Sequence, residues 1–286
     1  MSQTIDQSNQ TAEVITHQSS TNFLYSFLVL PRPKREAIET VYAFCRVVDD
    51  IVDEEHPATD PRQDLNHWRE EIVRCFDGQT PTTQLGRDIK RTIAQFPIPQ
   101  HLFEAMIDGM EMDLDQRRYA TFDELEGYCY HVASVTGLMC IEIFGYREPS
   151  ARDYAIKLGK ALQMVNIMRD LKEDTRRGRV YLPQDELARF GYSEKDLAAE
   201  VYNANFIALM RHQGERARTF FKQAREALHP TDRPQMVSAE IMGRIYFKIL
   251  ERIEAASYNV FDDTFKLSKA EKALVAISTW LRMRLR

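Results

Sequence analysis

The sequence predicts an all-α protein with a single domain. Helical periodicity recurs along most of the chain, and no alternating stretch makes a convincing strand. Glycine is scarce, with 11 among 286 residues, and no Gly/Ser-rich or Pro-rich linker divides the chain. The predicted helical segments cover residues 32–55, 62–77, 82–95, 99–117, 121–145, 150–175, 194–228, 233–258 and 268–284.

The first 18 residues are polar and lack the basic start and apolar centre of a signal peptide. We therefore expect a disordered tail over residues 1–18 and one domain over residues 19–286. No later stretch approaches the ~20 apolar residues that a membrane-spanning helix requires. The four cysteines have no metal or redox spacing, so we expect reduced core residues in a cytoplasmic protein.

Two pairs of aspartates fall on predicted helices with a spacing of four residues. Asp49 and Asp53 lie in AFCRVVDDIVDEE, and Asp170 and Asp174 lie in LQMVNIMRDLKEDTRRGRVYLP. Residues at i and i+4 share one helix face about 5–6 Å apart, so each pair presents two carboxylates in one direction. A single pair of this kind is usually a solvated acidic face, and this is the alternative interpretation.

The neighbours of the second pair favour a functional role. Gln163, Asn166, Asp170 and Asp174 follow the spacing i, i+3, i+7 and i+11, which places them in one polar stripe. Gly159 falls on the same line and would allow a close approach of another segment. Such a stripe is a poor core, and an ordinary surface does not need it, so we expect it to line a cavity.

Inward-facing carboxylates repel one another and are costly to desolvate unless cations neutralise them. Mg²⁺ prefers hard oxygen ligands and shares its coordination shell with substrate phosphates. The two pairs therefore predict a Mg²⁺-dependent enzyme that acts on a diphosphate. The net charge of −5, without a basic stripe, argues against nucleic acid as the partner.

The last predicted helix contains ALVAISTWLRMRLR, which joins an apolar face to Trp280 and to three arginines, Arg282, Arg284 and Arg286. Such a segment can lie on an anionic membrane surface, which would place the protein peripherally at the inner face of the membrane. The alternative is a final helix docked on the bundle, with its arginines complementing the helix dipole. The sequence does not decide between them.

Several motifs resemble the squalene/phytoene synthases, the head-to-head prenyl condensing enzymes, over roughly residues 19–277. The matching stretches are SSTNFLYSFLVLP, VYAFCRVVDDIVDE, GMEMDLDQRRYATFDELEGYCYHVAS and LQMVNIMRDLKEDTRRGRVYLPQDEL. CIEIFGYREPSARDYA, ARFGYSEKDL and SAEIMGRIYFKILERI are most similar to the bacterial presqualene diphosphate synthases of hopanoid pathways.

The resemblance implies an isoprenoid synthase fold, an all-α bundle around a central cavity that holds two allylic diphosphates. It also implies that Mg²⁺ binds between the two aspartate motifs. The implied metal ligands are Asp49, Asp53, Asn166, Asp170 and Asp174, of which the four aspartates also count as catalytic. The implied substrate-binding residues are Ser20, Phe23, Phe27, Arg46, Gln163, Asn166, Arg169, Arg179, Tyr181 and Tyr246.

Most of these assignments have a structural alternative. A salt bridge to Asp50 is the alternative for Arg46. The arginines after the second motif, Arg176, Arg177 and Arg179, lie where a flap could close over the phosphates, or are only solvated charge. The apolar candidates for the cavity lining can equally be plain core, and these are Phe23, Phe27, Leu138, Met164 and Met168.

Tyr128 matches a family tyrosine and is assigned as catalytic, because a phenol can stabilise a carbocation or relay a proton. Core packing is the alternative role for Tyr128 and Tyr246. For His131, structural packing is the expected role. The chain departs from the family pattern at Ser134 and Thr136, in a block usually written A-G-T-V-G. Near the C-terminus, Lys266 stands about where many relatives carry an arginine, without the bidentate geometry of arginine.

The expected activity is the Mg²⁺-dependent condensation of two farnesyl diphosphates to presqualene diphosphate. Whether NADPH then drives reduction to squalene stays open. The alternative is a phytoene synthase that uses two geranylgeranyl diphosphates, and a head-to-tail synthase or terpene cyclase shares the metal chemistry. Outside the enzymes, the alternative is a helical scaffold without catalytic activity. Retention of all four aspartates argues against it. No protein partner can be inferred.

Overall fold

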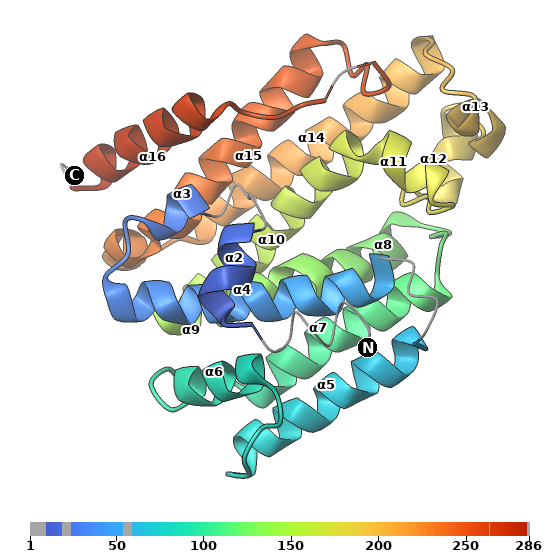
Figure 1. Cartoon of the computed structure of the whole chain (residues 1–286). Coiled ribbons are helices and arrows are strands. Elements are labelled where there is room, and N and C mark those ends of the chain that lie inside the picture. Colours follow the sequence, from blue (N-terminus) through green and yellow to red (C-terminus); the bar gives the residue numbers. More distant parts are fainter. Residues whose placement is uncertain (1–9, 19–23, 54–58, 263, 285–286) are drawn as a thin grey trace.

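The computed structural model describes residues 10–18, 24–53, 59–262 and 264–284 (Figure 1). Within these ranges every element is helical, apart from an isolated bridge between Arg118 and Val180. The all-α prediction is therefore confirmed. The elements are α2 (Ala12–Gln18), α3 (Leu24–Phe27), α4 (Arg32–Asp53), α5 (Pro61–Phe76), α6 (Gln84–Ile93), α7 (Gln100–Asp115), α8 (Phe122–Cys129), the π-helical turn η1 (Tyr130–Ser134), α9 (Val135–Phe144), α10 (Ser150–Arg169), α11 (Leu171–Arg176), α12 (Gln184–Arg189), α13 (Glu194–Ala198), α14 (Ala204–Ala227), the 3₁₀ helix η2 (Pro230–Met236), α15 (Val237–Ala255) and α16 (Lys269–Arg284).

Side-chain caps explain where several helices begin. Asp60 accepts a hydrogen bond from the backbone of Arg62 at the start of α5, and Asn203 does the same for Phe206 at the start of α14. The Asn203 cap follows Glu200, whose φ of 55° interrupts the helix. The predicted helix over 194–228 is therefore divided into α13 and α14.

The expected disordered tail over residues 1–18 is wrong for the part that forms α2. Ala12, Ile15 and Thr16 are buried at the spacing i, i+3 and i+4, and α2 packs against α4. The Thr16 hydroxyl donates to the backbone oxygen of Glu39. Burial of this short apolar face therefore orders a segment whose composition is mainly polar.

Helix α10 lies in the middle of the bundle and packs against α14, η1 and α9, while α4 packs against α2, α6, α7 and α9 (Figure 1). Aromatic side chains fill the core beside α4. Phe44 meets Trp68 and Phe103 edge to face, with ring centroids 5.7 and 5.2 Å away. These contacts fix the position of α4, which carries the first aspartate pair.

Two glycines hold the π-helical turn η1 between α7 and α10. A Cβ on Gly159 of α10 would lie 2.6 Å from the Cα of Ser134, and a Cβ on Gly109 of α7 would lie 2.9 Å from the Cβ of His131. Gly159 thus allows the close approach predicted from the sequence. The buried Ser134 hydroxyl adds a 2.8 Å hydrogen bond to the backbone oxygen of Ile156.

Replacing Gly159 with alanine should lower the free energy of unfolding by about 3 kcal/mol, because the new methyl group meets backbone that cannot move aside cheaply. Chemical denaturation with circular dichroism would measure this loss. Gly127→Ala is the matched control, since nothing lies within 4 Å of its added Cβ. The control should gain up to about 1 kcal/mol from helix propensity. Equal stability of the two variants would contradict the close contact.

Candidate active site

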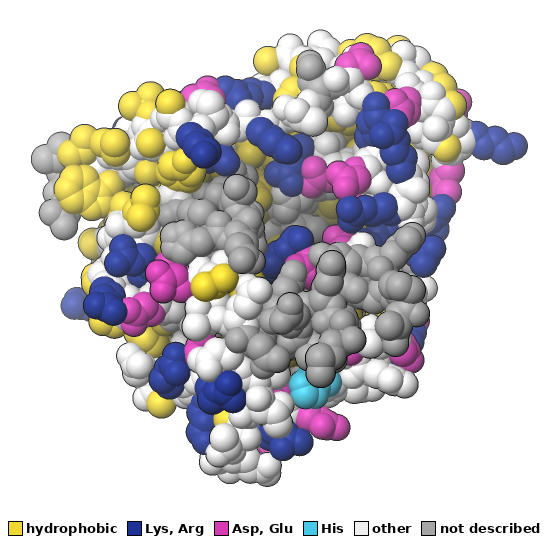
Figure 2. Space-filling view, in the orientation of Figure 1, with side chains coloured by type: hydrophobic (Ala, Val, Ile, Leu, Met, Phe, Trp, Pro, Cys, Tyr) yellow, Lys and Arg dark blue, Asp and Glu magenta, His cyan; other side chains and the backbone are white. Residues whose placement is uncertain are grey.

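The two aspartate motifs face a common region. Asp49 and Asp53 lie near the C-terminal end of α4, Asp170 separates α10 from α11, and Asp174 lies on α11. Charged side chains of both signs gather between α11 and the end of α4 (Figure 2). The two motifs are connected by Arg179, whose guanidinium donates to Asp53 Oδ1 at 2.5 Å and also attracts the charge of Asp174.

Crowding of negative charge changes the acidity of this site. Burial and the charge of Asp53 raise the pKa of Asp49 to about 7. Burial and the charge of Asp170 raise the pKa of Asp174 to about 7, with smaller contributions from Asp53 and Asp113. The carboxylates are therefore close enough to repel one another, as a site that binds cations requires.

Arginines neutralise this acidic group. Arg46 lies 3.3 Å from Asp49 and forms a second ion pair with Asp50, so the alternative assigned to it from sequence is also present. Arg169 binds the adjacent Asp170 with both a 2.7 Å and a 2.5 Å hydrogen bond. Arg177 lies 3.1 Å from Asp53 Oδ2, and Arg179 pairs with the other oxygen of the same carboxylate.

The polar stripe of α10 supplies further oxygen atoms. The Asn166 side chain donates to Gln163 Oε1 at 3.2 Å, while its own Oδ1 is buried without a hydrogen-bond partner in the described part of the chain. A buried oxygen acceptor beside several carboxylates fits the ligand preference of Mg²⁺. Among the described residues no three His, Cys, Asp or Glu side chains are already gathered at metal-binding distances.

A buried network lies beside the carboxylates. The hydroxyls of Tyr128 and Tyr181 donate to the two oxygens of Asp113, at 2.8 and 2.7 Å, and the two hydroxyls are 3.2 Å apart. Their rings stack with centroids 5.1 Å apart, and Tyr119 packs against both. Burial raises the pKa of Asp113, whereas the positive charge of Arg179 and the two tyrosine hydroxyls lower it.

Asp113 is a site residue that the sequence analysis missed. It follows Met106 and Met110 at i+7 and i+3, on a face of α7 that is otherwise apolar. An acidic residue on the apolar face of a predicted helix was therefore the available signal.

The segment after α11 is docked on the chain that precedes α8. Val180 donates its backbone N–H to the oxygen of Arg117, and Gln184 donates to that of Tyr119. This docking places Tyr181 against Asp113. Arg177 and Arg179 thus face Asp53, while Arg176 instead pairs with Glu200 at 2.9 Å.

A second group of cations lies near Arg169. Burial lowers the pKa of the Arg169 guanidinium, whereas Tyr246 on α15 lies close enough to raise it. Burial lowers the pKa of Lys272, and so do the nearby charges of Lys266, Arg169 and Lys269. Lys272 is a candidate phosphate-binding residue that the sequence analysis did not name. Lys266, expected to replace a family arginine, lies in the same group.

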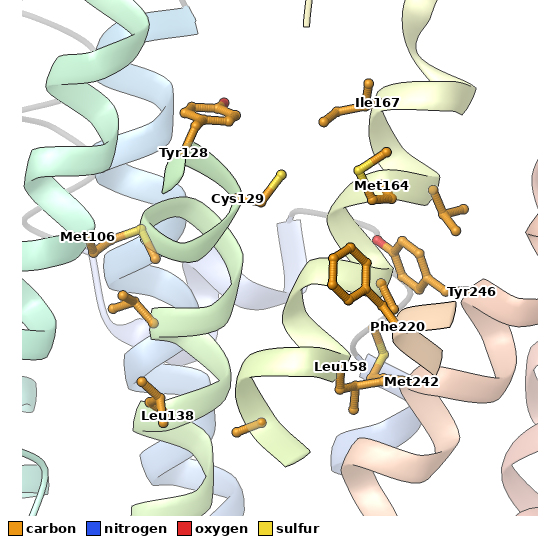
Figure 3. Close-up of a cluster of buried hydrophobic side chains, with 14 of the residues drawn as sticks. Met106, Tyr128, Cys129, Leu138, Leu158, Met164, Ile167, Phe220, Met242 and Tyr246 are labelled. Carbon is orange, nitrogen blue, oxygen red and sulfur yellow. The ribbon is translucent and has the colours of Figure 1, made fainter. Parts of the chain in front are cut away.

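The apolar candidates lie in the core next to these polar groups. Side chains from α7, α8 and α9 face side chains from α10, α14 and α15, and Met164 lies beside Tyr246 and Phe220 (Figure 3). Leu138, Met164 and Met168 are all buried. Tyr128 belongs both to this apolar cluster and to the hydrogen-bonded network.

The remaining candidate residues do not join the aspartate site, or they lie outside the described residues. Phe27 packs against Tyr42 and borders a cavity of about 1000 Å³ beside the first half of α4. Lys272 also borders this cavity, whereas none of the four motif aspartates lines it. Ser20 and Phe23 lie outside the described residues. His131 Nδ1 lies 2.8 Å from the backbone oxygen of Gly127, within its own helix.

Comparison with known proteins agrees with this architecture. The family model for squalene/phytoene synthase matches residues 16–271. A phytoene synthase of Arthrospira platensis is 37% identical, and the match covers 94% of this chain and 91% of that protein. The 15-cis-phytoene synthase of Synechocystis sp. is 35% identical, with coverage of 97% and 86%.

Two solved structures are similar throughout. The crystal structure of a dehydrosqualene synthase has a TM-score of 0.86 at 27% identity and covers 99% of both chains. The squalene synthase HpnC from Alicyclobacillus acidocaldarius has a TM-score of 0.77 at 28% identity and covers 88% of this chain and 95% of that one. The chain belongs to the squalene/phytoene synthase family, whose members are prenyltransferases. The predicted isoprenoid synthase fold is confirmed.

Proposed function

We propose that this protein joins two farnesyl diphosphates head to head and forms presqualene diphosphate. The main support is that two aspartate pairs, from α4 and from the α10–α11 junction, meet beside the Tyr128–Asp113–Tyr181 network. A buried apolar cluster continues from the same tyrosine (Figure 3). Such a combination suits a prenyl diphosphate, because the diphosphate requires cations and its hydrocarbon chain requires an apolar surface.

The polar half of the site would hold the leaving group. Mg²⁺ held by Asp49, Asp53, Asn166, Asp170 and Asp174 would stabilise the negative charge that develops on the departing diphosphate. Positively charged side chains in the same region, Arg46, Arg169, Arg179 and Lys272, would bind phosphate oxygens. Gln163 would orient the amide of Asn166, with which it is hydrogen-bonded.

The proposed reaction has three steps. The bond between C1 and oxygen of one farnesyl diphosphate breaks, and the electron pair leaves with the diphosphate. The allylic cation then bonds to the 2,3 double bond of the second molecule. Loss of one proton closes the cyclopropane ring. Burial of the apolar cluster keeps water from the cation.

Tyr128 is the proposed acceptor of this proton. Its hydroxyl donates to Asp113, so a lone pair on the phenol oxygen remains available as an acceptor. The phenol would accept the proton from the cation and pass its own proton to Asp113. Burial raises the pKa of this carboxyl group, which favours the protonated form.

The chain length of the substrate is supported by two observations. Met164 and Met168 are fully buried on the helix of the second motif, which leaves little room beside it for an added isoprene unit. The two structural neighbours are named as squalene-type synthases. The second candidate function is phytoene synthesis from geranylgeranyl diphosphate, and it is favoured by the names of the curated relatives.

Purified protein given farnesyl diphosphate and Mg²⁺ without NADPH should accumulate presqualene diphosphate. Geranylgeranyl diphosphate should react much more slowly, because a packed cavity resists even single methylenes. Product identification by mass spectrometry would measure both reactions, and a parallel reaction with NADPH would test for squalene. Efficient phytoene formation, with little turnover of farnesyl diphosphate, would replace this proposal with the second candidate.

A further inference from the structure

The outward face of α16 is apolar. Leu274, Ile277 and Leu281 follow the spacing i, i+3 and i+7, and they are 64%, 58% and 44% exposed. Residues with this spacing form one stripe along a helix. Figure 2 shows hydrophobic side chains gathered over α16. We call these three residues the apolar stripe.

Packing within the described part of the bundle leaves much of the apolar stripe exposed. The other side of α16 holds Val275, Ala276 and Thr279, which are buried, and the helix packs against α15, α3 and η2. The helix is therefore docked on the bundle, which was one of the two interpretations of its sequence. Its second apolar face remains exposed to solvent, at a free-energy cost that an apolar partner would remove.

Positive charge accompanies the apolar stripe. The sequence of α16 contains four basic residues and one acidic residue, a formal charge of +3 in a chain of net charge −5. A cavity of about 580 Å³ lies between α10, α14, α15 and α16, and Leu274 of the stripe borders it. The charged side chains that line this cavity are four cations, Arg225, Arg244, Lys248 and Arg282, and two carboxylates, Glu240 and Glu251.

We propose that the apolar stripe and the basic cavity beside it form a surface that docks on an anionic phospholipid bilayer. The stripe would enter the boundary between headgroups and acyl chains, and the cations would face lipid phosphates. None of the described helices is long and apolar enough to cross a membrane, so this contact lies in the plane of the surface. A second copy of the chain fits less well, because a two-fold interface would bring equal positive charges together.

Flotation of the full chain with vesicles made of equal parts phosphatidylglycerol and phosphatidylcholine tests this proposal. The wild type should float with these vesicles and should largely stay unbound with pure phosphatidylcholine. A variant carrying Leu274→Ser, Ile277→Ser and Leu281→Ser should bind at least about ten-fold more weakly, because it loses the apolar contact area. Lys248→Gln with Arg282→Gln should weaken binding about five-fold per charge, and added salt should do the same.

Val73→Ser is the matched control, since Val73 is 40% exposed on α5 and lies outside this surface. It should bind vesicles like the wild type, and all variants should keep the wild-type circular dichroism spectrum. Absence of wild-type binding, or equal binding by the triple variant, would overturn the proposal. So would a wild-type dimer in light scattering that the triple variant abolishes without any effect on vesicle binding.

Discussion

Replacing Asp170 with asparagine should lower turnover by about a hundred-fold or more while the helical fold remains intact. The substitution keeps the shape of the side chain but removes a negative charge that would hold Mg²⁺ against the diphosphate. Asp49→Asn should have the same effect on turnover. It should not lower the free energy of unfolding, because burial and neighbouring carboxylates disfavour the charged form of Asp49 and raise its pKa to about 7.

Diphosphate release under saturating substrate would measure turnover, and thermal unfolding would measure stability. Asp153→Asn serves as the control, because Asp153 is exposed in the first turn of the same helix α10. Its activity should match that of the wild type. A chelator should abolish wild-type activity, and Mg²⁺ should restore it. Full activity in excess chelator would remove the metal from the proposed mechanism.

Tyr128→Phe should lower turnover by about a hundred-fold, the usual scale for loss of a positioned proton-transfer group. The ring would still stack on Tyr181, so its stabilisation of a nearby cation should persist. The apparent Michaelis constant should change little, because the hydroxyl would act only after the substrate is bound. Loss of one hydrogen bond to Asp113 should cost about 1.5–3 kcal/mol of stability.

Tyr192→Phe separates catalysis from this stability effect. Tyr192 is also buried, and its hydroxyl donates to the backbone oxygen of Val201 at 2.8 Å. This variant should lose stability but keep wild-type turnover. Initial rates over a range of farnesyl diphosphate concentrations would compare the two variants. If Tyr128→Phe turned over like the wild type, Tyr128 would have a packing role only.

The sequence predicted the long helices well, because most of them are amphipathic and side-chain caps define the starts of some. It did not predict the short helices α2, α3 and α12. It also predicted that each aspartate pair shares a helix face, since that spacing is a local property. The partners of those aspartates could not be predicted in the same way. Arg179 pairs with Asp53 across 126 positions in the chain, a contact that only the packing of α11 and its following loop creates.

Asp113 also could not be identified from its local sequence alone. Its neighbours in GMEMDLD include two other acidic residues, Glu111 and Asp115, so its type alone does not distinguish it. The distinguishing property is burial between two tyrosine hydroxyls, one of which comes from a residue 68 positions later. Reading the apolar face of α7 would have identified the residue, but not its partners.

The π-helical turn η1 has a consequence for how this chain tolerates changes of length. The backbone N–H of Val135 bonds to the oxygen of Tyr130, five residues earlier, so the turn contains one residue more than an α-helical turn. Deleting one residue here could give a continuous α-helix with its backbone hydrogen bonds kept. The helices on the two sides of the turn would keep nearly the same rotation relative to each other, because the π-helical turn already holds its extra residue within about one turn. Tyr128 could then still face Asp113 while Thr136 faces Cys45, so this turn is a place where the chain could lose one residue and keep both contacts.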